Sequence, residues 1–183
     1  CGSCWAFSAA GTFDARYALQ KGGKTVDTYY AEQELVDCDP SSDGCNGGWM
    51  VHAFTYLAKA GFCTEKQYPY TARDGRCHDK DCSAGPKDAG TNKLWGIGET
   101  AVLKELHNGP IAVAVDAGKW FSYKKGILSS CGRSLNHGVV LVKSDFSEKS
   151  VTIRNSWGGS WGEKGYIRLA LGKNTCGYAS ESS

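Results

Sequence analysis

The chain has 183 residues, of which 41% are hydrophobic and 22% charged, and this composition is ordinary for a globular protein. Its formal net charge of +2 is too small to indicate a nucleic acid or an anionic membrane surface as partner. No apolar run approaches the roughly 20 residues that span a bilayer, so we expect binding to neither nucleic acid nor membrane.

The first part of the chain predicts helices. Apolar residues recur at helical spacing over 5–19, and Ser3 is a candidate N-cap, so Cys4 would fall in the first helical turn. Residues 31–36 are typical of a short helix. Residues 48–60 form an amphipathic pattern that ends at a glycine, which predicts another helix.

A polar stretch separates these helices from a region of strands. Residues 63–94 predict loops that are stapled by cysteines, and a helix is expected around 100–107. Segments rich in Val and Ile and bounded by turn residues predict strands over 111–116, 137–142, 150–155 and 165–171. Helices therefore precede strands, which predicts an α+β protein with a mainly helical lobe over 1–88 and a mainly β lobe over 89–183.

The cysteine content narrows the compartment and the chemistry. Nine cysteines in a chain of this length are typical of secreted or lumenal proteins. Because the number is odd, pairing of eight would leave one free thiol, which is a candidate nucleophile. An unpaired buried cysteine or an intermolecular bridge is the alternative that the count alone leaves open.

Among the four histidines, His137 is the candidate for catalysis. His52, His78 and His107 fall in a helix, a charged loop and near a helix end, where histidine is commonly structural or solvated. His137 instead opens the apolar strand LNHGVVLV. Asn155 lies in RNSWGGSWG, where tryptophans could shield its amide from water, as a useful hydrogen bond to an imidazole requires.

Four segments in this order resemble the papain-like cysteine proteases of the cathepsin L type: CGSCWAFS, GCNGG, the strand that begins at His137, and NSWGGSWG. A C-G-[SA]-C-[WY] motif with His and Asn about 130–150 residues downstream is a signature of this family, and His137 and Asn155 fit that spacing from Cys4. The resemblance extends over essentially the whole chain. It implies a two-lobe fold, with a helical lobe, an antiparallel β-barrel-like lobe and the active site in the cleft between them.

The resemblance also implies the catalytic roles. Cys4 would attack the peptide carbonyl as a thiolate, which a helix N-terminus and a facing imidazolium both favour. His137 would protonate the leaving amine and then help water to hydrolyse the thioester. Asn155 would orient the ring of His137, and Trp157 would cover the bond between them. No metal and no other cofactor is implied.

The resemblance places one oxyanion donor on the backbone N–H of Cys4. Members of the family supply the second from a glutamine a few residues before this motif. Because the chain begins at Cys1, and Gln20, Gln33 and Gln67 lie in the wrong places, we expect a papain-like peptidase domain that is N-terminally truncated. Losing one such donor lowers turnover by about 10²–10³-fold in a serine protease, so this chain alone could be weakly active.

By the same resemblance, three disulfides map onto Cys1–Cys45, Cys38–Cys77 and Cys131–Cys176. With Cys4 reserved for catalysis, Cys63 and Cys82 remain, and we expect them to form a fourth bridge. The resemblance does not cover this last pair, and an exchanged pairing of Cys38 with Cys82 and of Cys63 with Cys77 stays open.

The motifs also align residues with a substrate site. Gly47 and Gly48 would let an extended peptide pair with the backbone, although a simple glycine turn is the alternative. The pocket for the second residue before the scissile bond (P2) would be lined by Trp49, Met50, Ala114, Leu135 and Asn136, with Glu181 at its floor. This apolar wall favours Phe, Leu or Val, and Glu181 could add Arg unless it is merely a solvated residue. Trp161 would wall the leaving-group side.

An open cleft without an occluding insertion implies endopeptidase action on peptides and proteins. The expected partners are these substrates, cystatin-type inhibitors and the enzyme's own propeptide, and the expected state is a monomer in a lysosome, a vacuole or outside the cell. A thiol oxidoreductase using Cys1 and Cys4 would leave the His and Asn unexplained, and zinc would need clustered ligands that do not follow the motif. A catalytically inactive homologue that serves as a binding or structural protein is the stronger rival.

Overall fold

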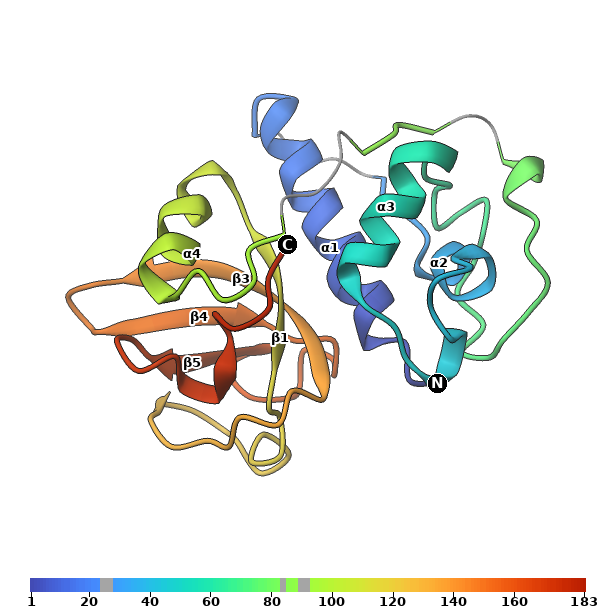
Figure 1. Ribbon diagram of the computed structural model, residues 1–183. Coiled ribbons are helices and arrows are strands. Elements are labelled where there is room, and N and C mark those ends of the chain that lie inside the picture. Colours follow the sequence, from blue (N-terminus) through green and yellow to red (C-terminus); the bar gives the residue numbers. More distant parts are fainter. Residues whose placement is uncertain (24–27, 83–84, 89–92) are drawn as a thin grey trace. The chain divides into compact units, whose positions relative to one another are not determined.

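The computed structural model describes residues 1–23, 28–82, 85–88 and 93–183, and the chain divides into two compact units, Cys1–Asn92 and Lys93–Ser183. Figure 1 shows helices in the first unit and the sheet in the second. The boundary predicted between 88 and 89 adjoins residues 89–92, which lie outside the described residues. None of the described helices has both the length and the apolar character needed to cross a membrane.

Three helices form most of the regular structure in the first unit, and all three were predicted. The described elements of this unit are α1 (Cys4–Gln20), α2 (Glu32–Cys38), the 3-10 turn η1 (Gly44–Asn46), α3 (Met50–Ala60) and the 3-10 turn η2 (Asp79–Asp81). Helix α3 begins later than the predicted residue 48, because the backbone of Trp49 is extended, with φ −122° and ψ 135°. It ends at Gly61, whose φ of 91° suits a residue without a side chain.

Helix α1 packs against α2 and α3, and eight of its residues are buried. Phe13 on α1 meets Tyr30 and Phe62 edge to face, with ring centroids 5.0 and 5.2 Å apart. In the predicted loop region 63–94, one side chain is nevertheless part of a core: Tyr68 is fully buried and packs with Ala31 and Cys63. This small core holds the loop region beside α2.

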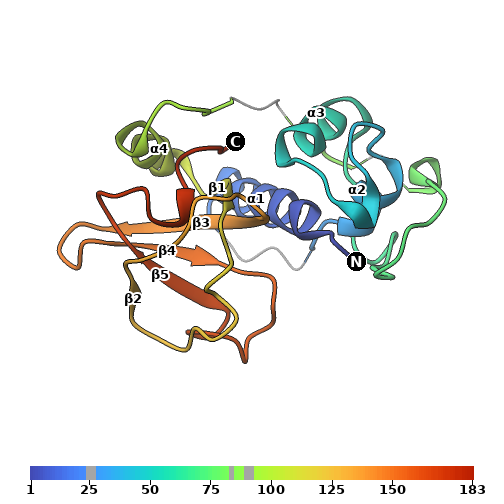
Figure 2. The same ribbon diagram turned by 60° about the horizontal axis from the view of Figure 1, so that its bottom comes forward.

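The second unit contains the sheet and two short helical segments before it. Its elements are α4 (Glu99–Glu105), η3 (Leu106–Asn108), β1 (Ile111–Val115), β2 (Ile127–Leu128), β3 (His137–Asp145), β4 (Ser150–Arg154), β5 (Tyr166–Ala170) and η4 (Thr175–Gly177). The strand order is β1-β3-β4-β5-β2, and Figure 2 shows β3, β4 and β5 side by side. The four predicted strands are confirmed, and β2 was missed because two residues carry no alternating pattern.

The expectation of a wholly antiparallel lobe needs one correction. Strands β1, β3, β4 and β5 pair antiparallel, but β2 pairs parallel with β5. Strand β3 also continues beyond the predicted residue 142 to Asp145, because it keeps pairing with β4 after a register shift between Leu141 and Lys143.

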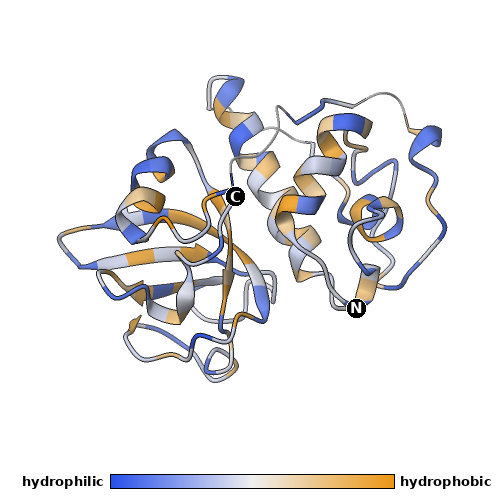
Figure 3. Cartoon of the chain, viewed as in Figure 1, coloured by the Kyte–Doolittle hydropathy of each residue, from blue (hydrophilic) through white to orange (hydrophobic). Residues whose placement is uncertain are grey.

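The core of the second unit is built on its buried strands. All five residues of β1 are buried, and Figure 3 shows the hydrophobic colouring that runs along this strand. The end of the chain covers the free edge of β1: the N–H of Ala114 donates to the carbonyl of Glu181, and Ala112 exchanges two backbone hydrogen bonds with Ser183. Glu181 is therefore held beside Ala114, and both residues were predicted to belong to the P2 pocket.

Candidate active site

Cys4 is the one free cysteine, and it is the first residue of α1. Its side chain is partly exposed, whereas Trp5 directly after it is buried. No acidic residue lies in the first turn of this helix, so a thiolate at Cys4 would meet the positive end of the helix dipole without a competing charge there. The arrangement is suited to a nucleophilic sulfur.

Contacts between the segments CGSC and GCNGG fix the backbone around Cys4. Cys1 is bonded to Cys45, and the N–H of Gly2 donates to the carbonyl of Cys45 at 2.7 Å. A Cβ on Gly2 would lie only 2.6 Å from that same oxygen, which explains why glycine stands between the two cysteines. The indole of Trp5 adds a hydrogen bond to the carbonyl of Gly44 at 3.1 Å.

Ser3 precedes the helix as predicted, but its hydroxyl does not cap it. The side chain forms no hydrogen bond to the helix backbone, and its Oγ instead lies 2.6 Å from the hydroxyl of Tyr70. Phe7 on α1 meets the ring of Tyr70 edge to face. Ser3 therefore ties the start of the helix to the loop around Tyr70, and its carbonyl accepts the N–H groups of Ala6 and Phe7.

Gly47 and Gly48 need to be glycine for different reasons. Gly47 has φ of 126°, and a Cβ there would meet nothing within 4 Å, so its outer side is open. A Cβ on Gly48 would lie 2.6 Å from the Trp5 ring and from Ser42. Gly47 thus leaves open space for another chain, whereas Gly48 allows this loop to pack against the residue that follows Cys4.

Trp49 and Met50 follow these glycines with contrasting exposure. Trp49 is 41% exposed, whereas Met50 is only 4% exposed at the start of α3. Trp49 and Met50 are the two residues of the first unit that were expected in the P2 pocket, and Trp49 presents far more surface within this unit.

His137 is the first residue of β3, and its ring is held by Asn155 in the loop after β4. Nε2 of His137 lies 2.7 Å from Oδ1 of Asn155, and the backbone N–H of Ser156 donates to the same atom at 2.8 Å. An atom that accepts a backbone N–H must be the amide oxygen, so it also accepts Nε2–H. In the neutral ring the basic nitrogen is then Nδ1.

Burial and the amide act on the His137 ring in opposite directions. Burial lowers the pKa of His137, and the hydrogen bond that its ring donates to Asn155 opposes this effect. Asn155 itself is 8% exposed, so water competes little for the bond.

Aromatic rings pack around the side chain of His137. The ring of Trp157 lies 5.0 Å from that of His137, and Trp120 meets His137 edge-on at 6.1 Å. Trp161 stacks on Trp120 and donates its indole N–H to the Trp120 carbonyl at 3.1 Å. Phe121, which is 77% exposed, stacks on Trp157. Trp120 and Phe121 were not singled out from the sequence, where their only signal is an aromatic pair in a polar stretch.

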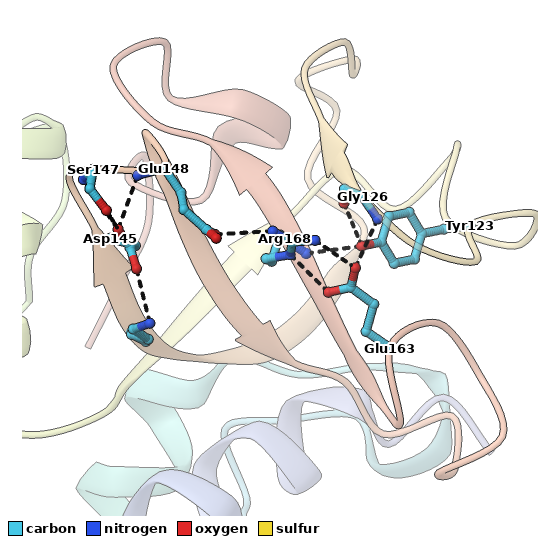
Figure 4. Close-up of polar contacts among 8 residues, drawn as sticks. Tyr123, Gly126, Asp145, Ser147, Glu148, Glu163 and Arg168 are labelled. Atoms are coloured by element: carbon cyan, nitrogen blue, oxygen red, sulfur yellow. Dashed lines mark hydrogen bonds and ion pairs between the residues drawn. The ribbon is translucent and has the colours of Figure 1, made fainter.

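The loop that carries Trp157 and Trp161 is anchored by an ion pair. Figure 4 shows Arg168 on β5 between Glu163 and Glu148. Two guanidinium nitrogens of Arg168 donate to Glu163 at 2.9 Å, and the N–H of Gly126 donates to the same carboxylate at 2.8 Å. The Arg168 guanidinium holds the pKa of the Glu163 carboxyl below its usual range. Charged residues at these spacings form no recognisable sequence pattern. We call the pair of Glu163 and Arg168 the clamp of this loop, and it was not predicted.

The other expected pocket residues of the second unit lie near its β1 edge. Asn136 is exposed, and its Oδ1 accepts the N–H of Ala117 at 3.0 Å. Leu135 is partly exposed and packs over Gly177, where a Cβ would lie 2.8 Å from its side chain. One carboxylate oxygen of Glu181 is buried without a hydrogen-bond partner among the described residues. An unpaired buried carboxylate oxygen is costly, so it is suited to a donor from outside the chain.

Four disulfides are present: Cys1–Cys45, Cys38–Cys77, Cys63–Cys82 and Cys131–Cys176. The exchanged pairing of Cys38 and Cys63 is not formed. Within the described residues, the one group with metal-like clustering is Cys38, Cys77 and Asp79, and its two sulfurs are bonded to each other and therefore cannot act as thiolate ligands.

The sequence matches the family described as "Papain family cysteine protease" over residues 1–183. The chain belongs to this family. It is 44% identical over 185 residues to a protein named cathepsin L 1 from Paramecium tetraurelia and 42% identical over 186 residues to cysteine proteinase B from Leishmania mexicana. These alignments cover 100% and 96% of the chain but only 57% and 41% of the relatives. The chain thus spans little more than half the length of the first of them.

Solved structures of papain-like enzymes have the same fold. A cysteine protease of Carica candamarcensis in complex with E-64 matches with a TM-score of 0.90 and 32% identity, covering 100% of this chain and 87% of that one. Digestive procathepsin L 3 from Tenebrio molitor matches with a TM-score of 0.88 and 36% identity, covering 100% and 62%. The papain-like α+β fold of the chain is therefore shown by relatives and solved structures alike.

Proposed function

We propose that this papain-family chain hydrolyses peptide bonds with Cys4 as nucleophile, His137 as general acid and base, and Asn155 as the residue that orients His137. The observation that carries the proposal is the His137–Asn155 hydrogen bond, which leaves Nδ1 as the basic nitrogen of a partly buried imidazole. The single free thiol at the start of a helix supplies the matching nucleophile.

The proposed reaction has two halves. His137 accepts the Cys4 proton at Nδ1, and the thiolate attacks the carbonyl carbon of the scissile bond. The protonated ring then donates to the leaving amine, and a thioester remains. In the second half Nδ1 takes a proton from water, the hydroxide attacks the thioester, and Cys4 leaves as the thiolate. The backbone N–H of Cys4 is one donor to the oxyanion that forms in both halves.

In the proposed reaction, Trp157 and Asn155 act by orienting His137. The bond from Nε2–H to Asn155 keeps Nδ1 as the nitrogen that exchanges a proton with Cys4, and the Trp157 ring packs beside His137, where it would shield that bond from water. A bond that is not exposed contributes more to the orientation of the ring.

We further propose endopeptidase action on an extended peptide. Gly47 leaves backbone open for a substrate strand, with Gly48 seating the loop behind it. Trp161 is proposed for the leaving-group side. In the P2 pocket, the residues Trp49, Met50, Ala114, Leu135 and Asn136 would favour an apolar side chain, and Glu181 would accept Arg as well.

Partners and compartment follow from the same proposal. The inhibitor E-64 in the Carica candamarcensis structure and the proform of the Tenebrio molitor enzyme support binding of E-64 and of an own propeptide by this protein. Cystatin-type inhibitors and a monomeric state are proposed with them. Four disulfides favour a lysosomal, vacuolar or extracellular location over a reducing compartment.

Labelling with a peptidyl epoxide tests the proposal on the full-length protein. Mass spectrometry should find one adduct at Cys4, and hydrolysis of a fluorogenic peptide should stop when the adduct forms. Cys4→Ala and His137→Ala should abolish hydrolysis, whereas His107→Ala, which alters an exposed ring bonded to the Leu103 carbonyl, should not. A folded protein that neither reacts with the label nor cleaves the peptide would instead be the inactive homologue.

A further inference from the structure

Asp116 follows the last residue of β1 and is only 9% exposed. One oxygen accepts the N–H of Gly118 at 2.9 Å, and the other accepts the N–H of Ser134 at 3.0 Å. The first bond closes a local turn, whereas the second reaches a segment that is remote in the sequence. Asp116 thus joins the end of β1 to the residues that lead into His137.

This carboxylate continues the pairing of two strands beyond the point where their ladder ends. The β1–β3 register ends with Val115 opposite His137. Before His137, the N–H of Asn136 still donates to the Val115 carbonyl at 2.9 Å, and the Asn136 side chain accepts the N–H of Ala117 at 3.0 Å. The Asp116–Ser134 bond is the next contact in the same series.

The geometry around Gly132 shows how closely this contact is packed. A Cβ on Gly132 would lie 2.1 Å from the Asp116 oxygen that accepts from Ser134. Any side chain at position 132 must therefore displace that oxygen. The neighbouring Cys131 sulfur lies 3.5 Å from the Asp116 carbonyl, but a sulfur in a disulfide has no proton to donate, so this is a packing contact.

Leu135 lies between the two residues that this series holds. Ser134 is bonded to the Asp116 carboxylate and Asn136 to Val115 and Ala117, whereas Leu135 has its side chain partly exposed over Gly177. Its position therefore depends on the bonds on either side. His137 depends on them less, because the β1–β3 ladder and Asn155 hold it independently.

We propose that Asp116 is a positioning residue for substrate specificity: its carboxylate holds Ser134, and thereby sets the place of Leu135 in the pocket for the second residue before the scissile bond. This inference rests on the proposed function, which assigns Leu135 to that pocket. Asp116 touches neither the substrate nor the reacting atoms. Its removal changes which side chain is accepted more than it changes the reactivity of Cys4.

Asp116→Asn keeps the size of the side chain but replaces one of its two acceptor oxygens with an NH2 group, which must face the N–H of Gly118 or that of Ser134. Gly132→Ala keeps the carboxylate but displaces the oxygen that accepts from Ser134, so the two variants disturb the Asp116 carboxylate in chemically different ways. The matched control is Asp145→Asn, because Asp145 also accepts backbone N–H groups, from Ser147 and Glu148, but at the other end of β3. Figure 4 shows that turn.

The experiment compares kcat/KM for two fluorogenic peptides that differ only in Leu or Phe at the second residue before the cleaved bond, using the full-length protein. We expect the Leu-to-Phe ratio to change about tenfold in Asp116→Asn and Gly132→Ala, since a displaced pocket wall acts like a missing methylene. Alkylation of Cys4 by iodoacetamide, which does not use the pocket, should change less than twofold. Asp145→Asn should leave both unchanged.

The outcomes of this experiment either support or overturn the positioning role of Asp116. A ratio within twofold of the wild type in both variants overturns the role of Asp116, as does an equal loss with both peptides together with slower alkylation, which marks general damage. If Asp116→Asn does not fold, Gly132→Ala decides alone, because residue 132 is exposed. A wild-type protein that cleaves neither peptide overturns the proposed function, and the inference falls with it.

Discussion

Asn155 presents one oxygen to both His137 Nε2 and the Ser156 N–H, at 2.7 and 2.8 Å. The second bond keeps the amide from turning, so the first bond fixes both the tautomer and the plane of the imidazole. The Nδ2 group of Asn155 is buried without a hydrogen-bond partner among the described residues. Stability alone would not favour such an unpaired donor, which indicates that the position of the oxygen is what matters here.

Asn155→Ala should lower kcat/KM for peptide hydrolysis by about 10²-fold, because the imidazole loses its fixed orientation. Asn155→Asp keeps an acceptor oxygen and should retain more activity than the alanine variant. Asn108→Ala, which removes an exposed amide bonded to Glu105, is the matched control and should behave as wild type. Activity of Asn155→Ala within twofold of the wild type would show that Trp157 and the strand hold His137 without the amide.

Glu34 predicts a pH dependence of stability in the first unit. Its side chain is 1% exposed, accepts the Cys63 N–H, and shares the Tyr56 hydroxyl with Asp79 at 3.1 Å from each. One hydroxyl proton cannot serve two carboxylates at once, whereas a proton on Glu34 satisfies both. Burial is the main cause that raises the pKa of Glu34 from 4.5 to about 7, and the charge of Asp79 adds to it.

Because this carboxyl binds its proton more tightly in the folded state, its contribution to stability is fully present below about pH 4.5 and is lost as the pH rises through about 7. The loss is on the order of 3 kcal/mol. Glu34→Gln should therefore flatten the fall of the melting temperature between pH 4.5 and 7. His137, whose pKa burial lowers, contributes with the opposite sign, so the difference between variant and wild type is the quantity to follow. Parallel curves for the two proteins would exclude this role of Glu34.

The Cys63–Cys82 bridge should stabilise the first unit, because it closes a loop with a sequence separation of 19 residues. The double variant Cys63→Ala/Cys82→Ala should lower the free energy of unfolding by about 3 kcal/mol, as expected for a loop of this size. Chemical denaturation measures this difference, and the epoxide labelling rate of Cys4 serves as the control that the site is intact. Titration of the native wild type should find one reactive thiol, and a second one would contradict the four-bridge pattern.

The residues that could be predicted from the sequence are those whose neighbours in the chain already constrain them. Helical periodicity located α1, and runs of β-branched residues located β3 and β4. Asn155 could be paired with His137 because tryptophan and glycine surround it in the sequence. Asp116 could not be found in this way, since its partner Ser134 is remote in the chain and an aspartate after a strand usually marks only a turn.

Two further features of the structure, the ion pair of Glu163 with Arg168 and the burial of Tyr68, could not be predicted from the sequence. The clamp of Glu163 and Arg168 forms because one side of β5 faces the loop. In the sequence, charged residues of this kind equally indicate a solvated surface. Tyr68 is buried in a stretch that is otherwise polar, because the disulfides Cys38–Cys77 and Cys63–Cys82 draw the loop around it. The burial of Tyr68 depends on this folded loop, so local composition did not reveal it.

Glu181 should decide whether a basic side chain is accepted at the second residue before the cleaved bond. One of its carboxylate oxygens is buried without a partner among the described residues, and the backbone bond between Glu181 and Ala114 keeps it at the β1 edge. A guanidinium that reaches this oxygen gains a charge-assisted hydrogen bond, which is worth about 1.5–3 kcal/mol or roughly 10–100-fold in kcat/KM.

Glu181→Ala should therefore reduce cleavage of an Arg peptide by that factor and leave the matched Phe peptide within twofold. Glu181→Gln, which keeps the shape but not the charge, should lose Arg cleavage in the same way, whereas Glu105→Gln, at the partly exposed last residue of α4, should lose neither. Equal losses of Arg and Phe cleavage in Glu181→Ala would mean that Glu181 supports the β1 edge without reading the substrate.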